Sequence, residues 1–151
     1  MRLLRSLLTK IGFAEAEAVS DPLYIFLLDD DVRRHEWFQR RFANDYVDIA
    51  ETPDEAIKRL RENRYDAIYL DHDLLPEHYN SVEPDDENTG YAVARWLAEN
   101  PASQRSATVT VHTRNADGAM RMIEVMRHAG RHAEYVPYTL LVQKTRLSPR
   151  R

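Results

Sequence analysis

The residues that could do chemistry gather just after three predicted strands. Three aspartates follow the apolar run 23–28, an Asp-His-Asp sequence follows the run 66–70, and a His-Thr pair follows the run 107–111. In chain order these residues are Asp29, Asp30, Asp31, Asp71, His72, Asp73, His112 and Thr113. A single acid at a strand end is common, but acids or histidines at three strand ends are hard to explain by surface solvation. They predict one shared site.

The carboxylates suggest a bound cation. Clustered carboxylates repel one another, and they need a cation or protons to coexist in a partly dry cleft. Oxygen ligands from two strand ends suit Mg²⁺, which binds a few carboxylates and keeps waters for a substrate phosphate. The sequence therefore predicts a divalent metal site at Asp29, Asp30, Asp71 and Asp73, with Mg²⁺ favoured and Mn²⁺ as the alternative. Asp31 is equally well placed, and the local turn decides which of the three neighbours point inward.

Two histidines beside the acids widen the chemistry. An imidazole pair together with carboxylates could hold a transition metal. Alternatively, His72 and His112 could act as general base and general acid at neutral pH. That arrangement suits phosphodiester hydrolysis, in which one group activates water and the other protonates the leaving hydroxyl. The plainer alternative is that both are hydrogen-bonded residues at strand ends. The other histidines are predicted at the surface or at helix ends: His35, His78, His128 and His132.

A predicted anion site adjoins His112. Thr113, Asn115 and Gly118 precede or begin a predicted helix. A helix N-terminus with hydroxyl and amide donors nearby binds anions, and a glycine lets a phosphate approach the backbone. We therefore expect these three residues to bind phosphate, with simple helix capping as the alternative for each.

Alternating strands and helices must position these residues. Short apolar or β-branched runs predict strands at 23–28, 46–50, 66–70, 107–111 and 133–142. Helical spacing of apolar residues predicts helices at 2–18 and 33–44, from Pro53, at 90–99, and from about Ala116 to Gly130. This alternation is typical of a parallel sheet with helices on both faces. Ligands of such sheets bind beyond the carboxyl ends of the strands.

Bulk composition excludes several classes of protein. A chain of 151 residues suits one domain, and its net charge of −4 argues against a cationic protein that binds extended DNA. The absence of cysteine excludes disulfides, thiol catalysis and Cys-ligated zinc. No apolar run approaches the ~20 residues of a membrane span, and Arg5 and Lys10 interrupt the only segment that looks like a signal sequence. We expect a cytoplasmic protein with no membrane partner and an undetermined oligomeric state.

Part of the pattern resembles the receiver domains of two-component response regulators, over about residues 24–138. Asp29 and Asp30 stand where receivers carry an acid pair, and Asp71 stands where they carry the phospho-accepting aspartate. Thr113 stands where they carry a Ser or Thr that contacts the phosphoryl group. The resemblance implies a flavodoxin-like, doubly wound α/β fold with five parallel strands in the order 2-1-3-4-5.

The added histidines resemble a narrower family, the cyclic-phosphate-processing receiver domains. That family carries Asp-His-Asp-Leu and His-Ser-x-Asn-x-x-Gly motifs. The counterparts here are residues 71–74 and 112–118, with Thr in place of Ser. The resemblance implies processing of a cyclic phosphate, such as a 2′,3′-cyclic nucleotide or the cyclic end of an RNA. The acidic loop 76–89 favours such a small nucleotide or RNA end over a long RNA.

One departure from receivers concerns function. Receivers carry a Lys-Pro pair after the fifth strand, and here Val136 precedes Pro137. The leading hypothesis is therefore a metal-assisted phosphoesterase. The alternatives are a non-enzymatic pseudo-receiver that serves as an interaction module, and a phospho-accepting receiver that uses Asp71.

A second departure concerns the chain ends. Receivers end with a helix after the fifth strand, and residues 143–151 are too short and too Pro-interrupted to form a good one. We therefore predict that an amphipathic helix within residues 1–20 covers the exposed flank of a receiver-like domain at 21–143, with pairing of this helix between subunits as the alternative. Residues 144–151 would form a basic tail.

Overall fold

Five parallel strands form a single sheet in the computed structural model, which describes residues 20–146. The sheet has the order β2-β1-β3-β4-β5. Its strands are β1 (Tyr24–Leu28), β2 (Tyr46–Ala50), β3 (Ala67–Leu70), β4 (Thr108–Val111) and β5 (Glu134–Tyr135). This order confirms the predicted flavodoxin-like α/β fold.

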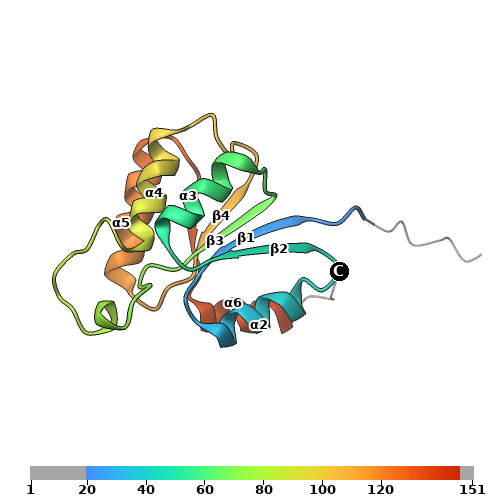
Figure 1. The fold of residues 1–151 in the computed structure, drawn as a ribbon, viewed down its shortest axis with the longest axis horizontal. Coiled ribbons are helices and arrows are strands. Elements are labelled where there is room, and N and C mark those ends of the chain that lie inside the picture. Colours follow the sequence, from blue (N-terminus) through green and yellow to red (C-terminus); the bar gives the residue numbers. More distant parts are fainter. Residues whose placement is uncertain (1–19, 147–151) are drawn as a thin grey trace, which may run out of the picture.

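Helices cover both faces of the sheet (Figure 1). They are α2 (Val32–Arg41), α3 (Pro53–Glu62), the short 3-10 helix η1 (Pro76–Tyr79), α4 (Gly90–Glu99), α5 (Ala116–His128) and α6 (Tyr138–Arg146). Helices α2 and α6 lie on one face, and α3, α4 and α5 lie on the other. Among the described residues, no helix is long and apolar enough to cross a membrane.

Side-chain caps begin the helices next to the strand ends. Asp31 accepts a hydrogen bond from the Arg33 backbone N–H and caps α2, and Asn115 accepts one from Gly118 N–H and caps α5. Polar side chains at this position satisfy N–H groups that have no partner within the helix. Because these caps directly follow β1 and β4, both helix starts lie at the carboxyl edge of the sheet.

Alternation along β3 sends successive side chains to opposite faces of the sheet. Ile68 and Leu70 pack in the core beneath α3, α4 and α5. Tyr69 faces the other way, and its ring centroid lies 4.9 Å from that of Phe38 on α2. Asp71 continues the direction of Tyr69, toward α2. His72 continues the direction of Leu70, toward α5.

The end of the chain differs from the prediction. The fifth strand covers only Glu134–Tyr135 and not 133–142, and α6 follows it through Arg146. The run Leu140 to Val142 was interpreted as strand because it is continuously apolar. In the helix these residues lie in different environments: Leu140 is 48% exposed, whereas Leu141 is half-buried. The expectation that the helix after the fifth strand is missing was therefore wrong.

The predicted helix at 2–18 lies outside the described residues. Its proposed role was to replace a missing C-terminal helix, and α6 already lies beside α2. Tyr138 of α6 contacts Trp37 of α2, with 5.5 Å between ring centroids. The premise for that role is therefore gone.

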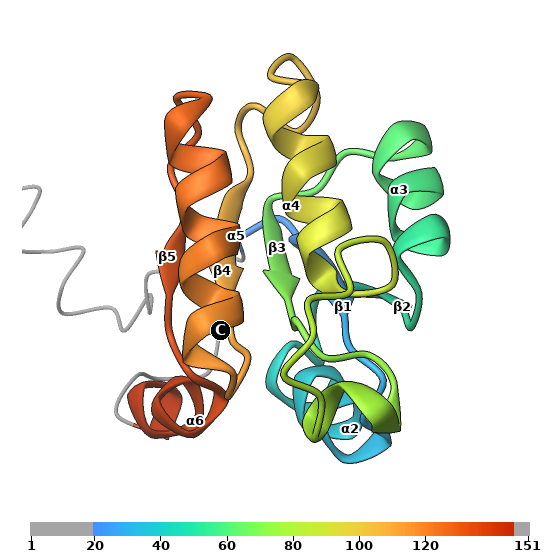
Figure 2. The same cartoon turned by 90° about the vertical axis from the view of Figure 1, so that its left-hand side faces the viewer.

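In the loop after β3, η1 lies next to the start of α2 (Figure 2), and the Tyr79 hydroxyl donates to Asp30 Oδ1 over 3.2 Å.

Gly90 allows the close approach of α4 to the end of β3. A Cβ at this position would lie 1.8 Å from the Asp71 carbonyl oxygen, which is backbone and cannot rotate away. We predict that Gly90→Ala lowers the free energy of unfolding by at least about 2–3 kcal/mol, measured by urea denaturation. The comparison variant is Gly130→Ala, whose Cβ would meet nothing but whose φ is +78°. It should cost only about 1–2 kcal/mol. A Gly90→Ala protein as stable as the wild type would contradict this packing.

Candidate functional site

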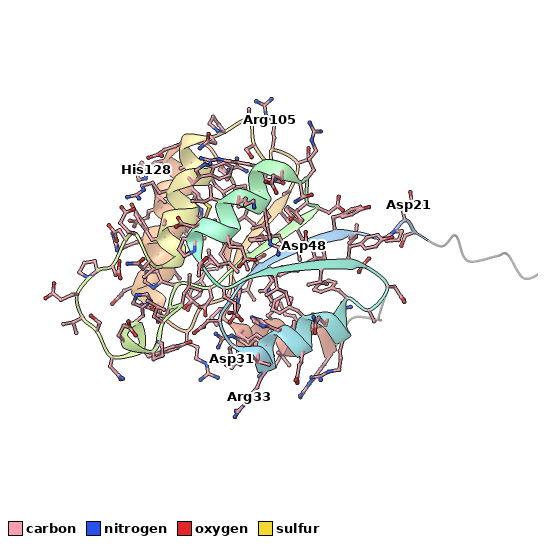
Figure 3. All side chains as sticks on the ribbon, in the orientation of Figure 1. Asp21, Asp31, Arg33, Asp48, Arg105 and His128 are labelled. Carbon is pink, nitrogen blue, oxygen red and sulfur yellow. The ribbon has the colours of Figure 1, made fainter. Side chains whose placement is uncertain are left out.

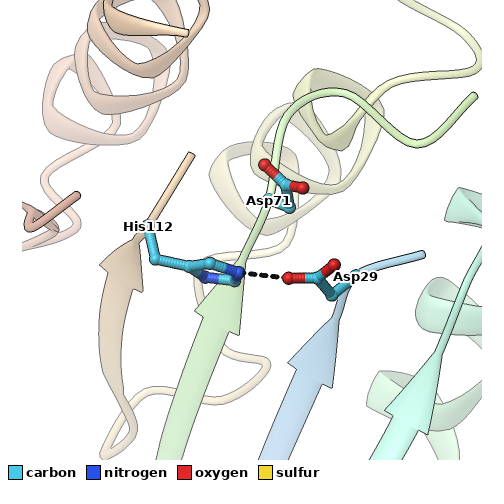
Figure 4. Close-up of side chains that lie close together, drawn as sticks. All are labelled: Asp29, Asp71 and His112. Atoms are coloured by element: carbon cyan, nitrogen blue, oxygen red, sulfur yellow. Dashed lines mark hydrogen bonds and ion pairs between the residues drawn. The ribbon is translucent and has the colours of Figure 1, made fainter. Parts of the chain in front are cut away.

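Asp29, Asp71 and His112 meet at the ends of three adjacent strands (Figure 4). Each offers a ligand atom within 4.8 Å of the other two. We call these three residues the Asp–Asp–His cluster. His112 Nε2 donates to Asp29 Oδ2 over 2.7 Å, and all three residues are at most 4% exposed. Carboxylates this deeply buried need compensating charge.

Arg34 supplies that charge. Its Nε and Nη2 donate to the two oxygens of Asp29 over 2.7 Å each, and Nη2 also donates to Asp71 Oδ2 over 2.8 Å. The adjacent Arg33 points away from the molecule (Figure 3). Arg34 was missed in the sequence, where its only signal is the i,i+4 and i,i+3 spacing from Asp30 and Asp31.

The pKa values show how the charges balance. Burial raises the pKa of Asp29, but hydrogen bonds from His112 and Arg34 outweigh burial and lower it to about 2. For Asp71, burial together with the negative charge of Asp29 raises the pKa, although His112 and Arg34 act against this rise. Burial lowers the pKa of Arg34, but its bonds to Asp29 more than offset this and raise it. Asp29 and Arg34 are therefore held as an ion pair.

Two of the four acids predicted to bind metal lie apart from this cluster. Asp30 is partly exposed, and its Oδ1 accepts the Tyr79 hydroxyl. Asp73 faces His72, whose Nδ1 lies 2.7 Å from Asp73 Oδ1. His112 lies with Asp29 and Asp71 in their place. The described structure thus offers two carboxylates and one imidazole as a ligand set, rather than four carboxylates.

His72 occupies a different environment from His112. The His112 ring packs against Phe38 on the α2 face, with centroids 5.6 Å apart. The His72 ring lies against Gly118 at the start of α5, where an added Cβ would lie 2.6 Å from the ring. Among the described residues, no group hydrogen-bonds to His72 Nε2. His72 also lines a cavity of about 310 Å³, which we call the His72 cavity.

The three predicted phosphate ligands already have partners in the protein. The Thr113 hydroxyl accepts from Asn115 N–H over 3.2 Å, and Thr113 acts against the rise in the pKa of Asp71. Asn115 caps α5 with Oδ1, and its Nδ2 donates to Asp73 Oδ1 over 3.3 Å. Gly118 provides the room for the His72 ring. Phosphate binding by these residues stays a prediction.

Two histidines predicted at the surface are instead buried. His35 is 9% exposed, and its Nε2 lies 2.7 Å from the Asp29 carbonyl oxygen. His78 is 8% exposed, and its Nδ1 accepts from the N–H groups of Leu74 and Leu75 over 3.2 Å each. Both bind backbone groups of segments flanking the site, which helical spacing could not reveal. They hold these segments in place.

The Asp–Asp–His cluster has the chemistry of a divalent metal site, but Arg34 shares its oxygens. Carboxylates with one imidazole suit Mn²⁺ and similar ions, whereas Mg²⁺ prefers oxygen ligands alone. All four oxygens of Asp29 and Asp71 already accept hydrogen bonds, three of them from Arg34. The ligand set therefore fits a cation that competes with Arg34.

Solved structures with this fold are receiver domains of response regulators. A cyanobacterial phytochrome response regulator, RcpA, solved in phosphorylated form, aligns with a TM-score of 0.61 and 20% identity over 83% of this chain and 88% of its own. TrrA from Thermotoga maritima, solved with Mg²⁺ and BeF, aligns at 0.56 and 18% identity over 82% and 98%. The Mn²⁺-bound form of the response regulator Rcp1 aligns at 0.58 and 17% identity over 83% and 88%. The chain thus has the fold of a response-regulator receiver domain.

The sequence identifies the family more narrowly. The profile of the cyclic-phosphate processing receiver domain matches residues 24–128, which include both histidine motifs. The chain belongs to this family. No curated protein sequence matches it.

The ion pairs of Asp29 predict a pH dependence of stability. Because the pKa of Asp29 falls from its usual 3.8 to about 2 on folding, its contribution is complete above about pH 4 and is lost as the pH falls toward 2. We predict that Asp29→Asn costs about 3–5 kcal/mol of unfolding free energy at pH 7, since it leaves Arg34 and His112 without their carboxylate. The variant should also lack the corresponding loss of stability between pH 4 and 2.

The matched control is Asp30→Asn. Asp30 is 3.8 Å from Arg34, with a side chain 22% exposed, and its loss should cost less than about 1 kcal/mol. Denaturant unfolding monitored by circular dichroism measures both variants. Equal losses of unfolding free energy in the two variants would show that the contacts of Asp29 with Arg34 and His112 do not stabilise the fold.

Proposed function

We propose that the chain hydrolyses a small cyclic phosphate diester, with His72 as the base that activates water. The observation that carries this proposal is the pairing of His72 with Asp73. An ionised carboxylate only accepts hydrogen bonds, so the 2.7 Å contact requires a proton on His72 Nδ1. In the neutral ring, Nε2 then carries a lone pair. A histidine oriented by a carboxylate in this way is the usual arrangement of a general base.

The surroundings of His72 favour catalysis over a purely structural role. Its ring is fixed by Asp73 on one side and by Gly118 beneath it. A structural histidine normally uses both ring nitrogens, as His78 does through Leu74 N–H and Asp85. His72 uses one and leaves Nε2 without a partner among the described residues; His112 likewise leaves Nδ1 without one, but it is His72 that lines the His72 cavity.

In the proposed reaction, His72 alone takes a proton from water and then gives it to the leaving oxygen. His72 Nε2 accepts a proton from water as the water oxygen forms a bond to phosphorus. The bond from phosphorus to the leaving sugar oxygen breaks, and that oxygen takes the proton back from Nε2. Asp73 stabilises the transient imidazolium through Nδ1–H. The products are a phosphate monoester and one free hydroxyl.

In this proposal His112 belongs to the Asp–Asp–His cluster rather than to the acid–base step. Its Nε2 donates to Asp29 Oδ2 over 2.7 Å, so that nitrogen is engaged within the cluster. Asp29, Asp71 and His112 would instead hold a divalent cation, most suitably Mn²⁺. A cation bound there would act as a Lewis acid on the phosphate oxygens. Asp71 and His72 are consecutive, with Cα atoms about 3.8 Å apart, so both halves adjoin at the sheet edge.

Replacing His72 tests the base. We predict that His72→Ala slows release of monoester from a 2′,3′-cyclic nucleotide by about 10²–10⁴-fold, followed by ion-exchange chromatography with Mn²⁺ present. His128→Ala is the control, because His128 is exposed and its Nδ1 lies 2.9 Å from the Glu124 carbonyl oxygen, within its own helix. Equal rates for His72→Ala and the wild type would remove His72 from the mechanism.

Replacing Arg34 tests the metal site. Removing its guanidinium frees carboxylate oxygens, so we predict that Arg34→Gln binds Mn²⁺ at least about tenfold more tightly than the wild type, measured by calorimetry. Saturating Mn²⁺ should also raise its unfolding temperature more than that of the wild type. Arg33→Gln is the control and should bind Mn²⁺ as the wild type does. Unchanged Mn²⁺ affinity in Arg34→Gln would contradict competition for this site.

A second candidate function is phospho-acceptance by Asp71. The observation in its favour is that Thr113 acts on Asp71 and opposes the rise in its pKa, since the receiver resemblance places this pair at the phosphorylation site. Arg34 on Asp71 Oδ2 and Val136 at the lysine position weigh against it. A stable phosphoryl group on Asp71 after treatment with acetyl phosphate, without monoester release from cyclic substrates, would favour this function. Neither reaction would occur in a pseudo-receiver.

A further inference from the structure

The His72 cavity has none of the three residues of the Asp–Asp–His cluster in its lining. Its walls come from the end of β3, from residues 81–85 of the following loop, from Thr89, and from the start of α5. At about 310 Å³ it is near the lower limit of the ~300–1,000 Å³ typical of small-molecule sites. It is large enough for a small ligand and too small for a folded partner.

Thr89 contributes a polar atom that the fold does not use. It occupies the N-cap position of α4, where a threonine hydroxyl normally accepts a backbone N–H, yet it makes no capping hydrogen bond. Thr89 is 1% exposed, and its hydroxyl has no partner among the described residues. A buried polar group without a partner destabilises a fold. Thr89 therefore resembles His72, whose Nε2 is also buried and unpaired beside the same cavity.

The position of Thr89 relative to His72 is fixed. The next residue, Gly90, donates its N–H to the His72 carbonyl oxygen over 2.8 Å. Gly90 also packs so tightly on Asp71 that no side chain fits between them. Thr89 and His72 are therefore held on one rigid backbone unit, as a ligand site requires. Both polar atoms are covered in this structure, so a ligand that reaches them must displace part of the cavity lining.

The cavity lining is acidic. Four carboxylates line it, from Asp73, Glu83, Asp85 and Asp117. Its one arginine, Arg121, pairs with Asp86 at 2.8 Å. Such a lining accepts hydrogen bonds from sugar hydroxyls and base amino groups, and it repels additional phosphates.

We propose that the His72 cavity binds the nucleoside part of a cyclic mononucleotide, with Thr89 as a specificity-determining contact. The predicted effect of Thr89 on hydrolysis rests on the proposed function. The inference names the substrate class as a cyclic phosphate without further phosphates, rather than the cyclic end of an RNA. The scissile phosphate would lie at the mouth of the cavity, between His72 and the Asp–Asp–His cluster.

The test compares Thr89→Val with Thr89→Ser on the four 2′,3′-cyclic mononucleotides. Thr89→Val should raise KM about tenfold with little change in kcat, because it removes a hydrogen bond to the part of the substrate that does not react. Thr89→Ser keeps the hydroxyl and should retain the wild-type KM. Thr89→Val should fold at least as stably as the wild type, since it replaces an unpaired buried hydroxyl with a methyl group. An unchanged KM in a folded Thr89→Val protein would overturn the role of Thr89.

A second arm tests the acidic lining. Adding a 5′-phosphate to the same cyclic nucleotides should lower kcat/KM at least about tenfold. Equal or faster hydrolysis of the 5′-phosphorylated substrates would show that RNA ends are accepted and would overturn the assigned substrate class.

Nucleoside binding separates this inference from the proposed function. The four unmodified nucleosides, titrated into the wild type and Thr89→Val and followed by NMR shifts of the His72 ring, should bind the wild type more tightly. If no cyclic phosphate is hydrolysed but nucleosides bind through Thr89, the proposed function fails and the cavity assignment stands. If cyclic mononucleotides are hydrolysed but nucleosides shift no His72 signal, the cavity assignment fails.

Discussion

The structure depends on the alternation of side chains where β3 ends. Consecutive residues of a strand point to opposite faces of its sheet, so Asp71 turns toward α2 and His72 turns toward α5. Each then meets a different set of partners: Asp71 meets Asp29, His112 and Arg34, whereas His72 meets Asp73 and Gly118. One short motif therefore serves two adjoining half-sites. The acidic half is balanced by positive charge, and each half keeps one imidazole nitrogen that is unpaired among the described residues, Nδ1 of His112 and Nε2 of His72.

Arg34 makes the acidic half compatible with a folded domain. Two buried carboxylates beside each other would be strongly unfavourable without a cation. The guanidinium geometry lets one side chain bind both Asp29 and Asp71 through fixed, charge-assisted hydrogen bonds. The receiver resemblance places a lysine at Val136, which is buried here and carries no charge. The positive charge thus comes from the opposite side, from the first turn of α2.

Much of the fold and part of the site could be predicted from the sequence. The strands and helices follow from local patterns, namely apolar runs, the Thr52 cap of α3 and the Asn115 cap of α5. The strand order follows from the resemblance to receiver domains. The convergence of Asp29, Asp71 and His112 follows from topology, because neighbouring parallel strands end at one edge. The same reasoning wrongly placed the run Leu140 to Val142 in a strand instead of in α6, because a short apolar stretch is compatible with either strand or helix.

The remaining features depend on tertiary contacts that have no short-range signature. Nothing in the spacing of Arg34 indicates that it turns inward while Arg33 turns outward. Asp73 was assigned to the metal because it is close to Asp71 in sequence, but it pairs with His72. Thr89 carries an N-cap signature, and only the structure shows that its hydroxyl makes no capping bond.

The central claim is that Asp73 holds His72 in the tautomer with a free Nε2. Nitrogen-15 NMR of the histidine rings at pH 8.5 measures this directly, with His72→Ala identifying the signal. The account predicts a protonated Nδ1 and an unprotonated Nε2 for His72, and loss of this tautomer preference in Asp73→Asn. A His72 ring protonated at Nε2 in the wild type would contradict the account, because that nitrogen could not then accept a proton from water.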